Sequence, residues 1–441
     1  MTFLLFLLYV VLFGYWIKHA SFFKEAKLSP PLLYFVFATK IGLGLLYAYI
    51  HQYYFHGKDT FVYFNGALQI SNTLLECPQY YFDALLGKNP IAPNTEVFTY
   101  PNSFIFWKDL GTYSIVHIHA LINFLAFDQY ELHLVFIAMI GMYASVTFYK
   151  LFSSCLNLPK PILIIACFFL PSLTFWTSGL HKEAYIYLGL SLFMSALYSV
   201  QWQGWTARTV VKALAGIFII GIIRHYLLLL LLPATIGYLI SLRIPNKPWR
   251  TYAITYISCI FVGSLAAQII FNIDLLQILT KQQALFFSEK GGSTITGISP
   301  MEPNFWSVAE MIPTAIINVM GRPFLWECKD FLQVLAAMEI MCFSLLAALA
   351  LLFRKPNQQA PNPLIPFIIA YVVSNLLLIG LLVINVGTIA RYRSISLGLF
   401  SVLLSQLFDF YRVRKQKSKA KILPPSNSLS SPKSNTKSVL H

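Results

Sequence analysis

The chain has 441 residues, of which 57% are hydrophobic and only 11% charged, and its mean hydropathy is +0.65. Soluble domains carry about 25% charged residues, so a soluble globular class is excluded. The net charge of +15 comes from basic residues scattered among short segments and a basic C-terminal stretch. This pattern fits membrane topology and anionic lipid, so we expect the lipid bilayer as a partner and no nucleic acid.

Long apolar segments predict the membrane spans. A run such as PFIIAYVVSNLLLIGLLVI, at 366–384, is long enough to cross a hydrocarbon core of about 30 Å. In lipid every backbone polar group must be satisfied internally, so the fold class is all-α. Eleven spans are expected at 2–17, 31–53, 131–151, 161–178, 184–200, 207–223, 225–242, 251–271, 331–353, 363–385 and 394–411.

One more apolar segment, 113–127, is ambiguous. If it is counted as a span, the basic loops fall on inconsistent sides of the membrane. If it is a helix lying on the membrane surface, the N-terminus is outside and the C-terminus cytoplasmic. Each short basic loop then lies in the cytoplasm, as the positive-inside rule requires. These loops carry Lys18, Lys24, Lys27, Lys150, Lys160, Arg208, Lys212, Arg243, Lys247, Arg250, Arg354 and Lys355.

This topology divides the chain into two parts. Residues 1–411 form a polytopic membrane domain with two long outer loops, 54–130 and 272–330, which carry short interfacial helices. Long loops in a compact protein are more often functional than decorative. Residues 412–441 are rich in Ser, Lys and Pro and are expected to form a disordered basic cytoplasmic tail.

The first outer loop supplies a candidate acid in HGKDTFVYFNGALQI, at 56–70. Asp59 stands where it would cap a short helix, with Tyr63 one turn later on the same face. An N-cap is a purely structural role. A carboxylate at the membrane rim can also act as a general base on a hydroxyl, or hold a divalent cation as cofactor.

Basic residues from four distant motifs fall on the predicted outer face. The motifs are FWTSGLHKEAYIY, IIGIIRHYLLLL, GRPFLWECKDF and NVGTIARYRS. Their basic residues include Lys182, Arg224, Arg322, Arg391 and Arg393. Arginine forks bind phosphate oxygens bidentately, and a low-dielectric wall strengthens each contact. We therefore predict a phosphate or pyrophosphate ligand at the membrane surface, with further contacts from His225, Glu327, Tyr63 and Trp176.

Each of these residues also has a structural interpretation. Arginines beside spans anchor to lipid phosphates, and Trp176 fits an aromatic belt. Glu183 is either a helix-start residue, a partner of a nearby arginine or part of the binding set. Arg224 has strongly apolar flanks on both sides, so it needs a partner or a watery cavity. Two charges lie within predicted spans, Lys40 and Glu339, and we expect both to face the bundle interior and to pair.

The chain resembles the GT-C class of membrane glycosyltransferases, which use polyprenyl-phosphate-linked sugars. The shared features are an acid just after an early span, a long outer loop with an interfacial helix, and basic residues at the ends of later spans. The phrases PSLTFWTSGLHKEA, IRHYLLLLL, GRPFLWE and GTIARYR also resemble motifs of bacterial integral membrane proteins associated with surface polysaccharide production. The resemblance covers roughly residues 55 to 400 and implies a bacterial inner (cytoplasmic) membrane location. It makes Asp59 the catalytic or metal-binding acid and the five basic residues contacts of the lipid phosphate.

The resemblance implies an inverting transfer of a sugar at the outer face of the membrane. The acceptor, a glycan or glycolipid, would attack the anomeric carbon while the basic cluster stabilises the departing polyprenyl phosphate. An oligosaccharide-repeat polymerase or ligase remains an alternative. A transporter or flippase for lipid-linked sugars is a second alternative, although transporters place their polar groups near the bilayer midplane.

Overall fold

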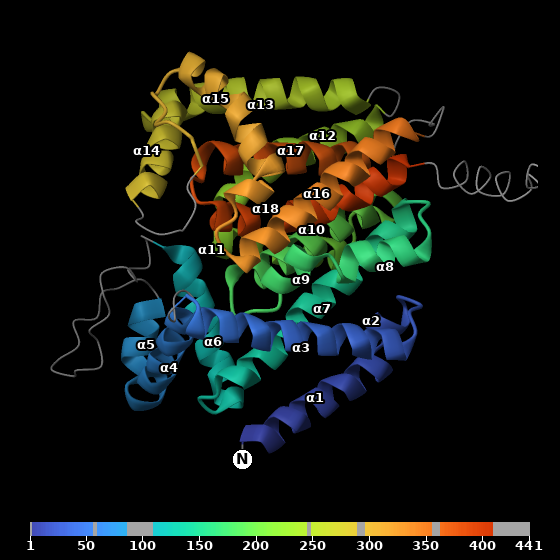
Figure 1. The fold of residues 1–441 in the computed structure, drawn as a ribbon, viewed down its shortest axis with the longest axis vertical. Coiled ribbons are helices and arrows are strands. Elements are labelled where there is room, and N and C mark those ends of the chain that lie inside the picture. The colour runs from blue at the N-terminus through green and yellow to red at the C-terminus, as the bar shows by residue number, and fades with distance from the viewer. Residues whose placement is uncertain are drawn as a thin grey trace, which may run out of the picture.

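A computed structural model describes residues 2–55, 60–85, 109–244, 248–288, 296–354 and 362–408. These residues form helices and no β-strand, apart from one isolated bridge between Arg354 and Phe408. The all-helical prediction is therefore confirmed for this part of the chain (Figure 1).

The helices of the first half are α1 (Thr2–His19), α2 (Ser21–Lys24), α3 (Pro30–Tyr53), α4 (Thr60–Glu76), α5 (Pro78–Leu85), α6 (Leu110–Ala126), α7 (Tyr130–Cys155), α8 (Lys160–Phe168), α9 (Pro171–Trp176) and α10 (Lys182–Gln203). Those of the second half are α11 (Ala207–Arg224), α12 (Tyr226–Arg243), α13 (Pro248–Phe271), α14 (Leu275–Ser288), α15 (Phe305–Gly321), the 3-10 turn η3 (Leu325–Glu327), α16 (Phe331–Leu352), α17 (Leu364–Leu382) and α18 (Val386–Leu407).

Several helices begin at a polar side chain that accepts a hydrogen bond from the first turn. Asp109 caps α6, Asn304 caps α15, Asp330 caps α16 and Asn385 caps α18. Each oxygen satisfies a backbone N–H group that the helix itself leaves unpaired. These capping residues therefore fix the positions at which the four helices begin.

In the described residues, eight helices are long and apolar enough to cross a membrane: α1, α3, α7, α10, α12, α13, α16 and α17. Three predicted spans differ from these eight. The span at 161–178 is divided into α8 and α9, with Pro171 at the start of α9. Both α11 and α18 are helices, but α11 starts with charged residues and α18 carries two arginines. The count of eleven spans therefore stays a prediction.

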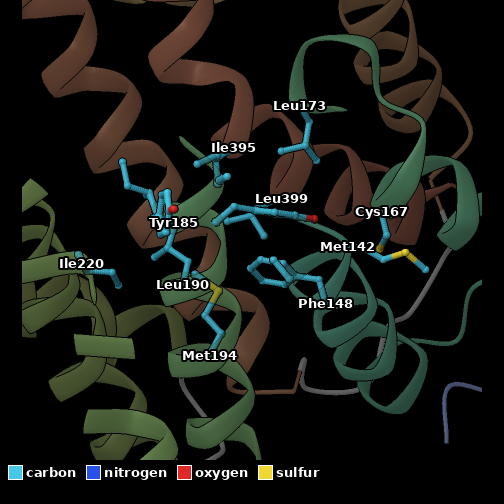
Figure 2. Packing of buried hydrophobic residues seen from close by; sticks show 14 of the residues in the cluster. Met142, Phe148, Cys167, Leu173, Tyr185, Leu190, Met194, Ile220, Ile395 and Leu399 are labelled. Carbon is cyan, nitrogen blue, oxygen red and sulfur yellow. The ribbon is translucent and has the colours of Figure 1, made fainter. Parts of the chain in front are cut away.

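The core lies around α7 and α10. The most apolar part of α7 is 83% buried inside the protein, whereas the corresponding parts of α1 and α13 are only 6% buried. Figure 1 places α1 and α13 at opposite edges of the bundle. Figure 2 shows the packing between them, where Phe148 of α7 lies near Leu190 and Met194 of α10 and Leu399 of α18, and Met142 of α7 lies beside Cys167 of α8. Apolar α1 and α13 surfaces are left for contact with lipid.

Ionic contacts define the two ends of the bundle. At one end Lys150, near the end of α7, pairs with Glu25, and the charge of Arg208 at the start of α11 acts on the same carboxylate. At the other end α10 begins, α11 ends and α18 begins. We call this second end the Glu183 end, because Glu183 lies there in contact with residues of both other helices.

Helix α6, which contains the ambiguous segment 113–127, packs against the bundle at the Glu183 end. More than half of its residues are buried, and its neighbours include α4, α7, α10 and α11. Gly111 permits the approach to α11, because a Cβ atom there would lie 2.2 Å from the backbone oxygen of Ile223. The segment predicted to be the first outer loop is therefore partly a packed helical layer (α4, α5 and α6).

Candidate functional site

A single buried carboxylate organises the Glu183 end. Glu183, in the first turn of α10, has no exposed surface. Its Oε1 accepts a hydrogen bond from Nη2 of Arg224 at 2.7 Å and lies 3.8 Å from Nε of Arg391. Its Oε2 contacts Nδ1 of His181. Side chains from α11, α18 and the link before α10 thus meet on one acid, and we call these four residues the Glu183 cluster.

The contacts of His181 indicate its tautomer. A carboxylate can only accept, so Nδ1 carries the hydrogen that faces Glu183. The other ring nitrogen, Nε2, lies 3.0 Å from Nη1 of Arg391, which can only donate. A neutral imidazole protonated at Nδ1 satisfies both contacts, but that nitrogen then cannot accept from the backbone N–H of Lys182, which lies 2.9 Å from it. A second proton would place two donors face to face.

Aromatic rings surround the two arginines. The guanidinium carbon of Arg224 lies 4.0 Å from the ring centre of Tyr392, and that of Arg391 lies 5.1 Å from the same ring. Trp176 is 6.0 Å from the guanidinium carbon of Arg391. On the other side, the Tyr63 ring lies edge-on to His181 at 5.5 Å. Cation–π contacts of this kind help to hold guanidinium groups in a desolvated place.

The Glu183 cluster retains positive charge. Two arginines face one carboxylate, and the neutral histidine adds no charge. Arg224 is 9% exposed and is committed to Glu183, whereas the Arg391 side chain is 16% exposed. An excess cation at the edge of a low-dielectric region attracts an anion more strongly than the same charge in water.

Lys182 belongs to a second pair, beside the cluster. Its Nζ lies 3.2 Å from Oδ1 of Asp109, which also accepts from the backbone N–H of Thr112. Burial alone would raise the pKa of the Asp109 carboxyl, but Lys182 and the Thr112 hydrogen bonds outweigh it and lower that pKa. Asp109 thus joins the cap of α6 to the start of α10.

Arg322 has a carboxylate partner of its own. Its Nε is 3.3 Å from Oε1 of Glu327, in the link between α15 and α16. Oε2 of Glu327 accepts from the backbone N–H of Phe324, so the ion pair also closes this turn. Both predicted contacts, Arg322 and Glu327, therefore lie in a partly exposed pair that is separate from the contacts made by Glu183.

The structure places Arg393 differently from the expectation. This arginine is almost fully buried, and its Nη1 donates to the backbone oxygens of Val319 and Arg322 at the end of α15. The reason is helical geometry: α18 starts at Val386, so Arg391 and Arg393 both lie inside it. Residues two apart in a helix point about 200° apart. Arg393 therefore joins α18 to α15 and is not part of the Glu183 cluster.

Three other expectations have separate outcomes. Asp59, the predicted acid, lies outside the described residues. His225 is exposed at the junction of α11 and α12. Lys40 is buried as expected, but its Nζ donates to Oγ1 of Thr177 at 3.2 Å, whereas Glu339 accepts from the backbone N–H of Ser172 at 3.0 Å. The expected pairing of Lys40 with Glu339 is wrong, because each reaches a different end of α9.

Sequence reasoning missed two members of this region. His181 is two residues before Glu183 in the same motif, and its proximity to a carboxylate was the available signal. Asp109 is followed three residues later by Thr112 and an apolar run, which is a helix-start pattern. Among the described residues, no group of three or more His, Cys, Asp or Glu side chains is arranged to hold a metal ion.

A buried polar chain fixes α6 below this region. Tyr185 contacts Nε2 of His119 at 3.0 Å, and the Nδ1 atoms of His119 and His133 are 2.9 Å apart. Nε2 of His133 faces Oδ1 of Asn123 at 3.3 Å, and the Asn123 amide donates to Asp128 at 2.6 Å. If every donor points the same way, from Tyr185 to Asp128, each contact is satisfied with both imidazoles neutral.

Comparison of the chain with family models, curated proteins and solved structures finds no match.

Proposed function

We propose that the protein is a membrane glycosyltransferase that transfers a sugar from a polyprenyl-phosphate-linked donor to a glycan or glycolipid acceptor. The reaction would take place at the outer face of a bacterial inner membrane, at the Glu183 end. One observation supports the proposal above others: Arg224 and Arg391, from distant segments, meet on one buried carboxylate and leave positive charge in excess.

In this proposal Arg391 makes the main contact with the lipid phosphate. It is the more exposed of the two arginines, and His181 and Tyr392 orient its guanidinium. When the acceptor hydroxyl attacks the anomeric carbon, the bond to the phosphate oxygen breaks and negative charge develops on the leaving group. A guanidinium already held in place stabilises that charge without reorganisation. Asp59 stays the predicted base that takes the acceptor proton.

The remaining cationic residues have secondary roles in this proposal. Lys182 is balanced by Asp109, and Arg322 by Glu327, so each attracts a second anion less than Arg391 does. Trp176 and Tyr63 lie beside Arg391 and His181 and offer aromatic surfaces for the sugar. A divalent cation, if used, would depend on Asp59.

The test is sugar transfer in proteoliposomes that contain polyprenyl-phosphate-linked donors. Arg391→Ala should lower kcat by about 100-fold or more, as expected for loss of one preorganised donor to a developing charge. Arg208→Ala is the matched control, because Arg208 is an exposed arginine at the opposite end of the bundle. Asp59→Asn should also abolish transfer. Equal activity of the Arg391 and Arg208 variants would overturn the assignment.

The product identifies the class of reaction. One added sugar agrees with the proposal. A ladder of repeat units would identify a polymerase, and movement of the lipid-linked sugar across the membrane without a product would identify a transporter.

A further inference from the structure

A small cavity lies inside the bundle next to Arg224. It is bordered by α10, α11, α12, α17 and α18. Its polar lining residues are Arg224 of α11, Asn375 of α17, and the tyrosines Tyr226, Tyr371 and Tyr392. This concentration of polar groups is unusual within apolar helices, where each unsatisfied group is costly.

Asn375 is the member of this lining whose hydrogen bonding is incomplete. Its side chain is 95% buried, because only 5% of its surface is exposed. Its Nδ2 donates to Oγ of Ser396 on α18 at 2.8 Å. Its Oδ1 is buried and has no hydrogen-bond partner within the described part of the chain. A buried acceptor of this kind costs free energy unless a donor reaches it.

Chemistry restricts what can fill the cavity. The space is close to the size of one water molecule, so a whole sugar ring or a phosphate does not fit. The occupant must donate to Asn375 Oδ1. It must also accept, because the neighbouring Arg224 guanidinium only donates. A hydroxyl group or water does both, whereas an apolar group or an anion does not.

We propose that the cavity beside Arg224 is a binding site for one hydroxyl-type oxygen, supplied by a water molecule or by a hydroxyl of a bound sugar. The oxygen donates to Asn375 and accepts from Arg224. Because Arg224 also holds Glu183, the occupant helps to orient the cluster from its inner side. The observations that support this site are the cavity and the unpaired oxygen of Asn375, so the site does not depend on the proposed glycosyl transfer.

The first experiment compares the unfolding temperatures of the natural protein and a variant of Asn375. In the purified protein, Asn375→Leu keeps the side-chain volume and removes the amide. If the site holds a hydroxyl oxygen, the variant loses satisfied hydrogen bonds and its unfolding temperature falls by a few degrees. If the cavity is dry, the variant loses only the hydrogen bond to Ser396, so its unfolding temperature falls no further than that of Ser396→Ala, which breaks the same bond. The second result would overturn the proposal.

Asn318→Leu is the matched control. Asn318 is also a buried asparagine with an unpaired amide atom, Nδ2, but it does not line the cavity. Its replacement should leave the unfolding temperature constant or raise it. The same response in both variants would count against the site.

A direct measurement is independent of any variant. High-resolution maps of the natural protein in lauryldimethylamine oxide, which has no hydroxyl, and in octyl glucoside should both show a peak near Asn375 Oδ1 if water is the occupant. A peak present only in octyl glucoside and continuous with its headgroup identifies a sugar hydroxyl. An empty cavity in both maps overturns the proposal.

Discussion

Glu183 divides its two carboxylate oxygens between different partners. Oε1 serves the arginines and Oε2 serves His181, so each partner has its own acceptor. A carboxylate with no exposed surface depends on these contacts, because it has no water to replace them. The same contacts hold Arg224 and Arg391 near each other despite their mutual repulsion.

Glu183→Gln tests this dependence. The amide has the same shape but no charge, so it leaves the buried Arg224 and the partly buried Arg391 without a counter-charge. The free energy of unfolding should fall by about 3–5 kcal/mol. Denaturation of the purified protein in detergent measures this, with Glu183→Asp as the variant that retains the charge. A fall below about 1 kcal/mol in the Gln variant would mean that water already reaches the cluster.

The pair of Asp109 and Lys182 predicts a pH dependence. The pKa of Asp109 is lowered in the folded protein, so the pair stabilises the fold above the usual aspartate pKa of about 3.9. This stabilisation is lost as pH falls through the lowered pKa. Asp109→Asn keeps a good helix cap and removes only the charge. Since the carboxylate is 45% exposed, we expect a loss of less than about 1 kcal/mol at pH 7.

The stabilities of the natural protein and the Asp109→Asn variant should converge as the pH falls below the lowered pKa of Asp109. The stability difference between the natural protein and the Lys182→Met variant should also disappear at acid pH. A difference that persists unchanged at acid pH would mean that the cap, and not the ion pair, carries the effect.

Sequence alone could predict that Arg224 needs a partner, because its flanks are apolar. It could not choose the partner, since Glu183 lies on another helix and only packing of α10 against α11 brings the two together. For Arg391 and Arg393, the sequence suggested too much in common. Their shared motif suggested one role, but the true start of α18 places them inside a helix and on different faces.

At the scale of helices, the chain from Tyr185 to Asp128 holds α6 in place. It links α10, α6 and α7, and Asn123 also donates to Ser71 of α4 at 2.9 Å. The same helix is tied to α10 by Asp109 at its start. The position of α6 therefore depends on polar contacts at three levels along its length.

Replacing His133 with Leu interrupts this chain in the middle. The Nδ1–H of His119 would lose its partner, whereas Oδ1 of Asn123 would still accept from the backbone N–H of Asp128, so the free energy of unfolding should fall by about 1–3 kcal/mol. His117→Leu is the control, because His117 is a buried histidine of α6, the helix that carries His119, and its Nε2 has no hydrogen-bond partner in the described structure. Equal stability losses in the two variants would show that the chain contributes nothing specific.

Helix existence was easier to predict than helix limits. Apolar length identified most of the spans, since lipid leaves helices as the only option for such runs. The division into α8 and α9 depends on contacts that composition does not report: Ser172 donates to Glu339 of α16, and Lys40 reaches Thr177 just after α9. Tertiary partners stabilise a broken helix that sequence represented as one span.

The whole molecule separates two kinds of charge. At one end Lys150, Glu25 and Arg208 lie at the surface, and at the other end the Glu183 cluster is largely buried. The predicted topology makes the first end cytoplasmic and the Glu183 end external. The order of the helices and the ion pairs agree with helices that run in alternating directions through the bundle. Which end of the bundle faces the cytoplasm stays a prediction.

Cysteine labelling tests this direction. In a variant without the six natural cysteines, a membrane-impermeant maleimide should label Trp326→Cys in intact cells, because Trp326 is 81% exposed at the Glu183 end. Trp205→Cys, between α10 and α11 and 60% exposed, should react only after permeabilisation. The reverse pattern would place the site in the cytoplasm.

The polar chain below the site has a direction, and this makes its members unequal. Asp128 can only accept as a carboxylate, so the order of donors and acceptors is fixed from that end. Tyr185→Phe removes the first donor and leaves every later contact intact, whereas a change at His133 divides the chain. Tolerance to substitution should therefore be graded, lowest in the middle and highest at the tyrosine. Double-mutant cycles would measure this gradient as coupling between neighbours.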